Sequence, residues 1–459
     1  MSDLPISDRS DSDLTAVFKA YDIRGLVPEQ LDARDCAAIG AAFARFVESD
    51  DGSGTVVIGR DMRPSGIELV AAFTEGVLGQ GLDVIDIGLA STDMLYFASG
   101  ELDAPGAMFT ASHNPAGYNG IKLCRRSAGP IGQESGLMAI RDLAADPPAP
   151  GGRRGERRED ELLGRFADHV RSFVDRDRLA PLKVVADTAN GMGGLVAPAV
   201  FDGLPFDVEI LFGELDGTFP NHPADPIQPE NQRDLQARVL ETGADLGLAF
   251  DGDADRVFLV DETGELLSGS LTTAIVAKGI LAREPEATII HNLICSKTVP
   301  EVITENGGTA VRTRVGHSFI KQEMAETGAV FGGEHSGHYY FRDNFRADSG
   351  LIAALVVLEQ LSEAGVPLSE LRKPFERYTA SGELNTTVHD QQAVVERVAA
   401  EFAGADQDRL DGLTVDLGDW WFNLRASNTE PLLRLNLEAA DPAACQRHVS
   451  EIQALMQGD

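Results

Sequence analysis

Cysteines are few in this chain, and long apolar runs are missing. The 459 residues include four cysteines, which form no CxxC pair and lie far apart: Cys36, Cys124, Cys295 and Cys445. This spacing argues against a zinc site or a disulfide framework and is typical of proteins of a reducing cytoplasm. No segment approaches the roughly 18 apolar residues of a membrane-spanning helix. We therefore expect a cytoplasmic protein with no membrane partner.

Basic residues are scarce relative to acidic ones. Lysine and arginine number 39 against 73 aspartates and glutamates, so the formal net charge is −34. A field of this sign repels phosphate backbones and anionic lipids, and we expect no nucleic-acid partner. We interpret the charge as a solvated acidic surface, with adaptation to a salty cytoplasm as a hypothesis. The opening segment, MSDLPISDRSDSDL, lacks the basic region and apolar core of a secretory signal.

A threefold pattern of strand and helix signals runs along most of the chain. Each copy begins with an apolar run, at 55–59, 182–186 and 287–291. A helix-like stretch follows, and then a second strand-like run, at 83–87, 207–211 and 310–314. A third strand ends in a polar loop, at 110–115, 251–256 and 332–338. Strands that alternate with helices indicate parallel α/β units, whose ligands bind at the carboxyl ends of the strands.

This pattern predicts an α/β protein with three similar mixed α/β domains and a smaller C-terminal α+β domain around one central cleft. A Pro- and Gly-rich stretch at 146–155 reads as a linker, and 261–264 reads as a tight turn. The predicted domains are residues 1–150, 151–261, 262–374 and 375–459. The last contains another polar loop, at 425–431, between two strand-like runs.

The loop 251–256 reads DGDADR, in which three aspartates alternate. Alternate residues of an extended segment point the same way, so Asp251, Asp253 and Asp255 can converge on one hard cation. Arg256 places a positive charge beside that cation. An EF-hand is excluded, because Arg256 stands where the sharp-turn glycine is needed and the flanking segments look like strands. A solvated acidic turn is the alternative, and the position after a buried strand favours the metal site.

The loop 110–115 reads TASHNP and is followed by YNGIK at 118–122. Ser112 is a candidate nucleophile, and His113 and Lys122 are close enough in sequence to assist proton transfer or stabilise charge. The segment is not the GxSxG elbow of α/β-hydrolases. Taken alone, it is better explained by an N-capping or turn serine.

The two remaining loops carry hydrogen-bonding groups. In GGEHSGH, at 332–338, Glu334 and Ser336 can bind vicinal sugar hydroxyls. The alternative there is a metal site built from Glu334, His335 and His338. RASNTEP, at 425–431, offers a guanidinium, two hydroxyls and an amide for a phosphate, or is simply a polar hairpin turn. A metal, a phosphate and a sugar together indicate phosphoryl transfer.

In this order and spacing, TASHNP, DGDADR, GGEHSGH and RASNTEP resemble the motifs of the α-D-phosphohexomutase superfamily, along essentially the whole chain. FKAYDIRG, at 18–25, and GRDMR, at 59–63, add to the resemblance. Within the superfamily, GGEHSGHYYFRD and WWFNLRASNTEPLLRLN are most similar to segments of bacterial phosphomannomutases, some of which also accept glucose phosphates.

The resemblance implies an isomerase-class intramolecular phosphotransferase that interconverts hexose 1-phosphate and hexose 6-phosphate. Ser112 would be the phosphoserine, with a bound hexose 1,6-bisphosphate as intermediate and activator. Asp251, Asp253 and Asp255 would hold Mg²⁺ together with the Ser112 phosphate. Arg24, Lys122 and His338 match positions that assist proton transfer or stabilise the transition state. The positions that match substrate-binding residues are Arg256, His317, Lys321, Glu334, Ser336, Arg425, Ser427, Asn428 and Thr429.

A mutase must release and rebind one ligand in two orientations, so we predict that the C-terminal domain hinges near residue 375. Phosphoglucosamine mutase is the alternative within the superfamily. A phosphatase with Ser112 or Asp251 as nucleophile belongs to another reaction class, and a calcium-loop carbohydrate-binding protein is the non-enzymatic alternative. We expect small-molecule sugar phosphates as partners and a monomer or homodimer.

Overall fold

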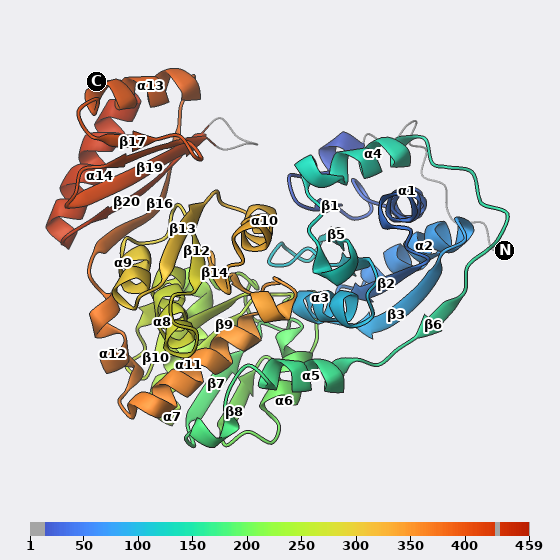
Figure 1. Cartoon of the computed structure of the whole chain (residues 1–459), viewed down its shortest axis with the longest axis horizontal. Helices are drawn as coiled ribbons and strands as arrows, with labels where there is room; N and C mark the ends of the chain where they lie inside the picture. The colour runs from blue at the N-terminus through green and yellow to red at the C-terminus, as the bar shows by residue number, and fades with distance from the viewer. Residues whose placement is uncertain (1–13, 427–431, 459) are drawn as a thin grey trace.

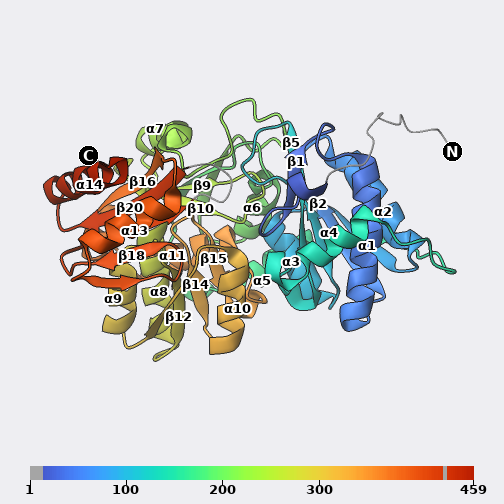
Figure 2. The ribbon, with the colours of Figure 1, turned by 90° about the horizontal axis from the view of Figure 1, so that it is seen from above.

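The computed structural model describes residues 14–426 and 432–458, which form four sheets with their helices. Figure 1 shows the chain running from the first sheet on the right, through the second and third in the lower centre, to the fourth at the upper left. The view from above separates the first and fourth sheets to opposite ends of the molecule (Figure 2). The predicted class, three mixed α/β domains and a smaller C-terminal domain, is confirmed.

The first sheet has the strand order β1-β5-β4-β2-β3-β6. As the sequence pattern predicts, β2 pairs in parallel with β3 and β4, whereas β5 returns antiparallel to β4. The strand β6 lies beyond residue 150 and covers the outer edge of β3, so this sheet takes a strand from past the predicted boundary. The strands are β1 (Ile23–Leu26), β2 (Thr55–Arg60), β3 (Asp83–Leu89), β4 (Gly106–Phe109), β5 (Tyr118–Cys124) and β6 (Arg157–Glu159). The helices are α1 (Ala33–Asp51), α2 (Gly66–Gly79), α3 (Thr92–Glu101) and α4 (Leu137–Ala145).

The second sheet has the order β11-β10-β9-β7-β8. Parallel pairing joins β7 to β8 and β9, and a tight connection turns β10 antiparallel to β9. Strands on both sides of the DGDADR loop exclude an EF-hand, as expected. The strands are β7 (Lys183–Asp187), β8 (Asp207–Leu211), β9 (Leu246–Phe250), β10 (Val257–Asp261) and β11 (Leu266–Leu267). The helices are α5 (Leu163–Arg171), α6 (Gly193–Phe201) and α7 (Arg233–Thr242).

The third sheet has the order β13-β12-β14-β15, and only its last pair is antiparallel among the described strands. The strands are β12 (Thr288–Asn292), β13 (Thr309–Thr313), β14 (Phe331–Gly333) and β15 (Tyr339–Phe341). The helices are α8 (Gly269–Arg283), α9 (Thr298–Glu305), α10 (His317–Thr327), α11 (Gly350–Ala364) and α12 (Leu368–Leu371). Most of α11 is apolar and buried. Across the described ranges, no single helix is long and apolar enough to cross a membrane.

The fourth sheet is antiparallel, with the order β16-β20-β19-β18-β17. Its strands are β16 (Thr379–Thr387), β17 (Asp406–Asp408), β18 (Leu413–Asp416), β19 (Trp420–Ala426) and β20 (Leu432–Ala439), and its helices are α13 (Gln391–Glu401) and α14 (Pro442–Gln457). This unit has an apolar core of its own, from Val388 to Met456. Another apolar cluster, from Val57 to Phe375, is continuous through the first three sheets. The predicted hinge near residue 375 therefore falls between separately packed bodies, and it stays a prediction.

Candidate active site

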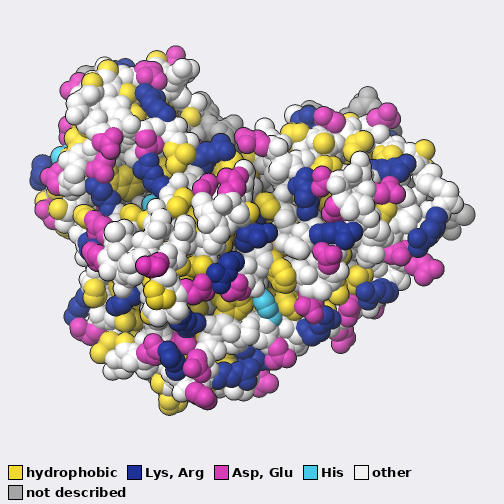
Figure 3. All heavy atoms as spheres, in the orientation of Figure 1, with side chains coloured by type: hydrophobic (Ala, Val, Ile, Leu, Met, Phe, Trp, Pro, Cys, Tyr) yellow, Lys and Arg dark blue, Asp and Glu magenta, His cyan; other side chains and the backbone are white. Residues whose placement is uncertain are grey.

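Loops from the first, second and third sheets meet at one place. The serine loop follows β4, the aspartate loop joins β9 to β10, and the third loop joins β14 to β15. Ser112 of the first loop bonds to Asp251 of the second, and Arg256 pairs with His338 of the third in an isolated antiparallel bridge. The space-filling view shows this face hollowed between the lobes of the first and fourth sheets (Figure 3).

Ser112 has the geometry of a nucleophile rather than of a capping residue. Its backbone φ is 48°, in the left-handed region that residues other than glycine rarely adopt. The Ser112 Oγ donates a hydrogen bond of 2.8 Å to Asp251 Oδ2 and accepts one of 3.3 Å from Arg256 Nη2. An N-capping serine would instead accept a bond from an amide of its own loop. The side chain of Ser112 is thus directed into the second domain.

A fully buried arginine holds the serine loop, and the sequence interpretation missed it. Arg63 follows β2, and Asp61 balances its charge through Nε at 3.1 Å. Its Nη1 and Nη2 donate hydrogen bonds of 2.7 to 2.9 Å to the backbone carbonyls of Ser112, Asn114, Pro115 and Tyr118. The GRDMR motif contributed to the resemblance, but nothing in its spacing showed that this guanidinium would reach a loop about 50 residues away.

Gly252 allows the aspartate loop to approach the serine loop. A Cβ atom at Gly252 would lie 2.5 Å from the carbonyl oxygen of Ser112, so a larger residue would force the loops apart. Thr92, at the start of α3, adds a further bridge, because its Oγ1 donates to Asp253 Oδ2 at 2.5 Å and its amide donates to the Asp253 carbonyl at 3.0 Å. Close approach of backbone to backbone thus places Ser112 against the carboxylates.

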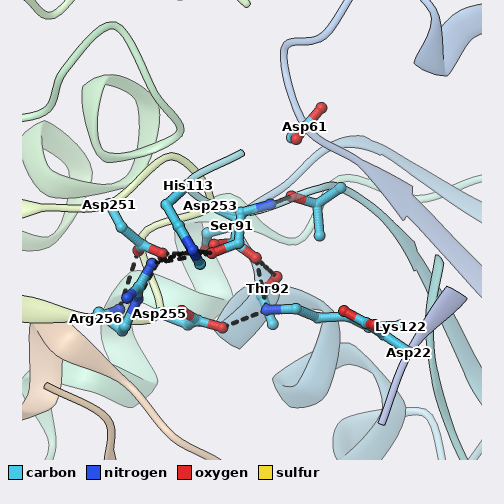
Figure 4. A network of polar contacts seen from close by, with 12 residues as sticks. Asp22, Asp61, Ser91, Thr92, His113, Lys122, Asp251, Asp253, Asp255 and Arg256 are labelled. Atoms are coloured by element: carbon cyan, nitrogen blue, oxygen red, sulfur yellow. Dashed lines mark hydrogen bonds and ion pairs between the residues drawn. The ribbon is translucent and has the colours of Figure 1, made fainter. Parts of the chain in front are cut away.

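The predicted metal ligands Asp251, Asp253 and Asp255 are buried and lie close enough together to share one ion. Lys122 Nζ donates to Oδ2 of Asp253 at 2.8 Å and of Asp255 at 2.6 Å (Figure 4). The Oδ1 atoms of Asp253 and Asp255 have no hydrogen-bond partner among the described residues. Buried carboxylate oxygens without partners are costly, and Mg²⁺ takes oxygen ligands. The donor set therefore fits a hard divalent cation.

Burial and charge separate the pKa values of these carboxyl groups. Burial raises the pKa of Asp251 well above its usual range, with Arg256 acting against it. Burial alone would also raise the pKa of Asp253, but the Lys122 ammonium lowers it. Burial and then the charge of Asp253 raise the pKa of Asp255. Burial would lower the pKa of Lys122, yet Asp253 and Asp255 hold it well above its usual value.

His113 lies at the site as predicted, but its surroundings do not favour proton transfer. Its Nδ1 accepts a hydrogen bond of 2.6 Å from Arg256 Nη2 and lies 3.2 Å from Ser112 Oγ. Burial, followed by the charges of Arg256 and Arg24, lowers the pKa of His113 to about 2. A general base needs a free lone pair and a pKa near the working pH. The geometry instead suits a neutral imidazole that orients Arg256.

The third loop is held rigidly beside the aspartate loop. Glu334 is buried and accepts hydrogen bonds of 2.7 to 3.1 Å from Asn292 Nδ2, Gly316 N and Tyr340 OH. Ser336 Oγ lies 3.1 Å from His338 Nδ1, and His338 Nε2 lies 3.8 Å from Asp255 Oδ1. His335 instead contacts Ser270 Oγ at 3.0 Å, so the alternative metal site with His335 does not form.

His317 and Lys321 lie in the first turns of α10. The half-buried His317 ring is in edge contact with Tyr21, 5.3 Å between centroids. Lys321 is buried, and its Nζ lies 3.6 Å from the centroid of the Tyr96 ring and 3.7 Å from Asp348 Oδ1. Burial lowers the pKa of both His317 and Lys321.

Two further predicted residues, Arg24 and Arg425, are described by the structure. Arg24, on β1, donates to Asn114 Oδ1 at 2.6 Å and so reaches the serine loop. Arg425, at the end of β19, donates to Asp411 Oδ2 at 3.3 Å and is the described part of the predicted phosphate loop. Ser427, Asn428 and Thr429 lie outside the described residues.

Known domain families match the chain in four consecutive segments. Three of them are the alpha/beta/alpha domains I, II and III of phosphoglucomutase/phosphomannomutase, at residues 15–146, 164–264 and 268–378. The fourth is the phosphoglucomutase/phosphomannomutase C-terminal domain, at residues 383–455.

Full-length relatives agree with these matches. "Phosphohexose mutases" of Xanthomonas campestris pv. campestris is 41% identical over 447 residues, covering 96% of this chain and 99% of the relative. A phosphomannomutase of Salmonella montevideo is 39% identical over 452 residues, covering 96% and 98%. A solved phosphoglucomutase/phosphomannomutase family protein from Burkholderia thailandensis, 32% identical, superposes with a TM-score of 0.89 over 96% of this chain and 98% of its own. The chain therefore belongs to the phosphoglucomutase/phosphomannomutase family, the α-D-phosphohexomutases.

Proposed function

We propose that this enzyme is a phosphomannomutase that interconverts mannose 1-phosphate and mannose 6-phosphate and also accepts glucose phosphates. The observation that carries the proposal is the hydrogen bond of 2.8 Å from Ser112 Oγ to Asp251, inside a buried cluster of carboxylates and cations. Relatives named phosphomannomutase at 37 to 40% identity support mannose as the principal sugar. Phosphoglucosamine mutase is the alternative that the same site allows.

The reaction begins with a phosphoryl group on Ser112. The free O1 or O6 hydroxyl of the bound hexose phosphate attacks the phosphorus, the P–Oγ bond breaks, and Ser112 Oγ leaves and is protonated as the attacking hydroxyl loses its proton. The resulting hexose 1,6-bisphosphate turns over in the cleft and returns its other phosphoryl group to Ser112. The same bisphosphate, added in trace amounts, would phosphorylate Ser112 and so act as the activator.

Positive groups stabilise the charge that spreads over the transferring phosphoryl oxygens. Arg256 already donates to Ser112 Oγ, and Arg24 reaches the same loop through Asn114. Lys122 is positioned by the hydrogen bonds that it donates to Asp253 and Asp255. We assign Mg²⁺ to Asp251, Asp253 and Asp255 together with the Ser112 phosphate; when bound, it neutralises charge on that phosphate.

The other groups bind the sugar and its second phosphate. Glu334 is oriented by its hydrogen bonds to accept from a sugar hydroxyl, with Ser336 beside it as a further partner. On the side formed by the third domain, the site is lined by His338, His317 and Lys321. Arg425, with Ser427, Asn428 and Thr429, would hold the phosphate that is not reacting. We further propose a cytoplasmic enzyme, monomeric or homodimeric, whose partners are sugar phosphates.

Ser112→Ala should abolish the isomerisation, because no other group receives the phosphoryl. We expect a rate loss of about 10³-fold or more, measured as a ³¹P NMR time course with mannose 1-phosphate, Mg²⁺ and a trace of hexose 1,6-bisphosphate. Ser172→Ala, which changes an exposed serine of the second domain, is the matched control and should keep wild-type activity. Growth of inorganic phosphate instead of the 6-phosphate signal would make the protein a phosphatase, and faster turnover of glucosamine 1-phosphate would favour the alternative mutase.

Arg63→Lys should lower both the activity and the stability of the enzyme. Lysine keeps the charge beside Asp61 but cannot reach the carbonyls that the guanidinium holds, so the serine loop loosens. We expect about 10- to 100-fold lower kcat, with about 1 to 3 kcal/mol lost from the free energy of unfolding in urea. Arg45→Lys, at an exposed pair with Glu48, should change stability by no more than about 0.5 kcal/mol and leave activity intact. Full activity in Arg63→Lys would show that these carbonyl contacts do not position Ser112.

The fourth-sheet body should rotate toward the other domains when a sugar phosphate binds. It packs separately from them, and Arg425 gives it a contact for the non-reacting phosphate. The change is measured by small-angle X-ray scattering as a smaller radius of gyration with mannose 1-phosphate, and by comparing crystals of free and bound enzyme. Mannose without phosphate is the control and should cause no change. Superposable domain positions in the free and bound crystals would contradict the hinge.

A further inference from the structure

A carboxylate outside the predicted site lies behind the third-domain side of the cleft. Asp348 precedes α11 and is 2% exposed. Its Oδ1 lies 3.7 Å from Lys321 Nζ, and its Oδ2 lies 3.8 Å from His338 Nε2. The Oδ1 atom has no hydrogen-bond partner among the described residues. One buried carboxylate therefore faces two side chains that we assign to the substrate.

The surroundings of Asp348 are rigid. The next residue, Ser349, caps α11 through a hydrogen bond from Ile352 N and donates from Oγ to Asp93 Oδ2 at 2.7 Å. Asp93 lies on α3 of the first domain, and the same helix carries Tyr96, whose ring contacts Lys321. Asp348 thus lies where α3, α10 and α11 meet, and it cannot shift without breaking contacts between the first and third domains.

Lys321 depends on this carboxylate for its charge balance. Burial lowers the pKa of Lys321, and among nearby charges Asp348 acts most strongly against that effect. The ring of Tyr96 adds a cation–π contact but no counter-charge. A buried ammonium without its counter-charge would lose its proton or move toward solvent.

His338 depends on Asp348 in a different way. Asp348 and Asp255 each place a carboxylate oxygen 3.8 Å from Nε2, whereas Nδ1 has one carboxylate at that distance, Glu334, and Ser336 Oγ at 3.1 Å. Negative charge near Nε2 favours the tautomer with its proton on that nitrogen, which leaves Nδ1 to accept from Ser336. The imidazole is thereby oriented relative to both the third loop and the aspartate loop.

We propose that Asp348 is a positioning residue that holds Lys321 and His338 in place for the sugar phosphate. This proposal rests on the proposed function. By distance, Asp255, His338 and Asp348 would also fit a second cation. However, Asp255 is already assigned to the first cation, and the Lys321 ammonium beside Asp348 repels a second one. The carboxylate acts on the protein's own cation instead.

The test compares Asp348→Asn with Asp343→Asn, a control five residues earlier that changes an exposed carboxylate paired with Arg342. The assay is run at pH 8, because burial raises the pKa of Asp348 to about 7. We expect Asp348→Asn to keep its unfolding temperature within a few degrees, to lower kcat/KM about 10- to 100-fold and to weaken calorimetric binding of mannose 1-phosphate. Asp343→Asn should match the wild type in all three.

A mutant cycle in a Lys321→Met/His338→Gln background separates positioning from general stability. If Asp348 acts through Lys321 and His338, Asp348→Asn should add no more than about 3-fold to the loss that these two changes cause together. Full additivity, or wild-type kinetics and binding in Asp348→Asn, would overturn the proposal. If Asp348→Asn does not fold, Asp348→Glu carries the same cycle, and additivity there would overturn it equally. If the wild-type chain binds mannose 1-phosphate without turnover, the proposed function is refuted. The calorimetric comparison of wild type with Asp348→Asn would still test the role of Asp348.

Discussion

The compensation of buried charge is the constraint on which this site depends. Three aspartates from the second domain lie out of contact with water, and the cations nearest to them come from different places. Lys122 reaches Asp253 and Asp255 from β5 of the first sheet, whereas Arg256 pairs with Asp251 within its own loop. Charges that are this deeply buried are stable only when paired. The pairing of Lys122 with Asp253 and Asp255 therefore joins the first and second domains.

The same constraint explains the arrangement of the nucleophile. Arg63 binds the backbone carbonyl of Ser112, and Asp251 accepts a hydrogen bond from its side chain. Gly252 permits the close contact between the serine loop and the aspartate loop. Each of these contacts uses a rigid group or the backbone itself. Such a site can hold the serine in its left-handed conformation, because the surrounding hydrogen bonds offset the strain. The reacting end of the substrate would thus meet a preorganised set of charges.

The fourth domain packs separately from the other three. Its core is separate from the apolar cluster that joins the other three, so its position relative to them depends on surface contacts such as the ion pair of Lys297 with Asp416. Partly exposed ion pairs contribute little stability and exchange readily. We propose that the reaction takes place in the rigid centre and that the non-reacting phosphate binds on the separately packed fourth domain. This division suits a ligand that must be released and bound again in the opposite orientation.

Much of the fold and of the site was predictable from local patterns. The apolar runs at 55–59, 182–186 and 287–291 became β2, β7 and β12, because short runs rich in β-branched residues and bounded by turn residues favour strands. The loops with Ser112, Asp251 and Glu334 were recognised from the order and spacing of their motifs taken together, since the Ser112 loop alone is better explained as a turn. By contrast, β6 was not foreseen at the edge of β3, since its RRE sequence carries no strand signal and pairing alone makes it a strand.

The sequence by itself determined the kinds of groups present: a serine, a set of carboxylates, and two further polar loops that we propose bind the sugar and a phosphate, each after its own strand. Only the tertiary structure decided which groups act together. Arg63 reaches the serine loop, and Asp348 reaches Lys321 and His338, through contacts between segments that are distant in sequence. It also placed His113 where burial and the charges of Arg256 and Arg24 lower its pKa. The physical reason is that burial and neighbouring charge set the state of an ionisable group, and both arise only when the domains pack.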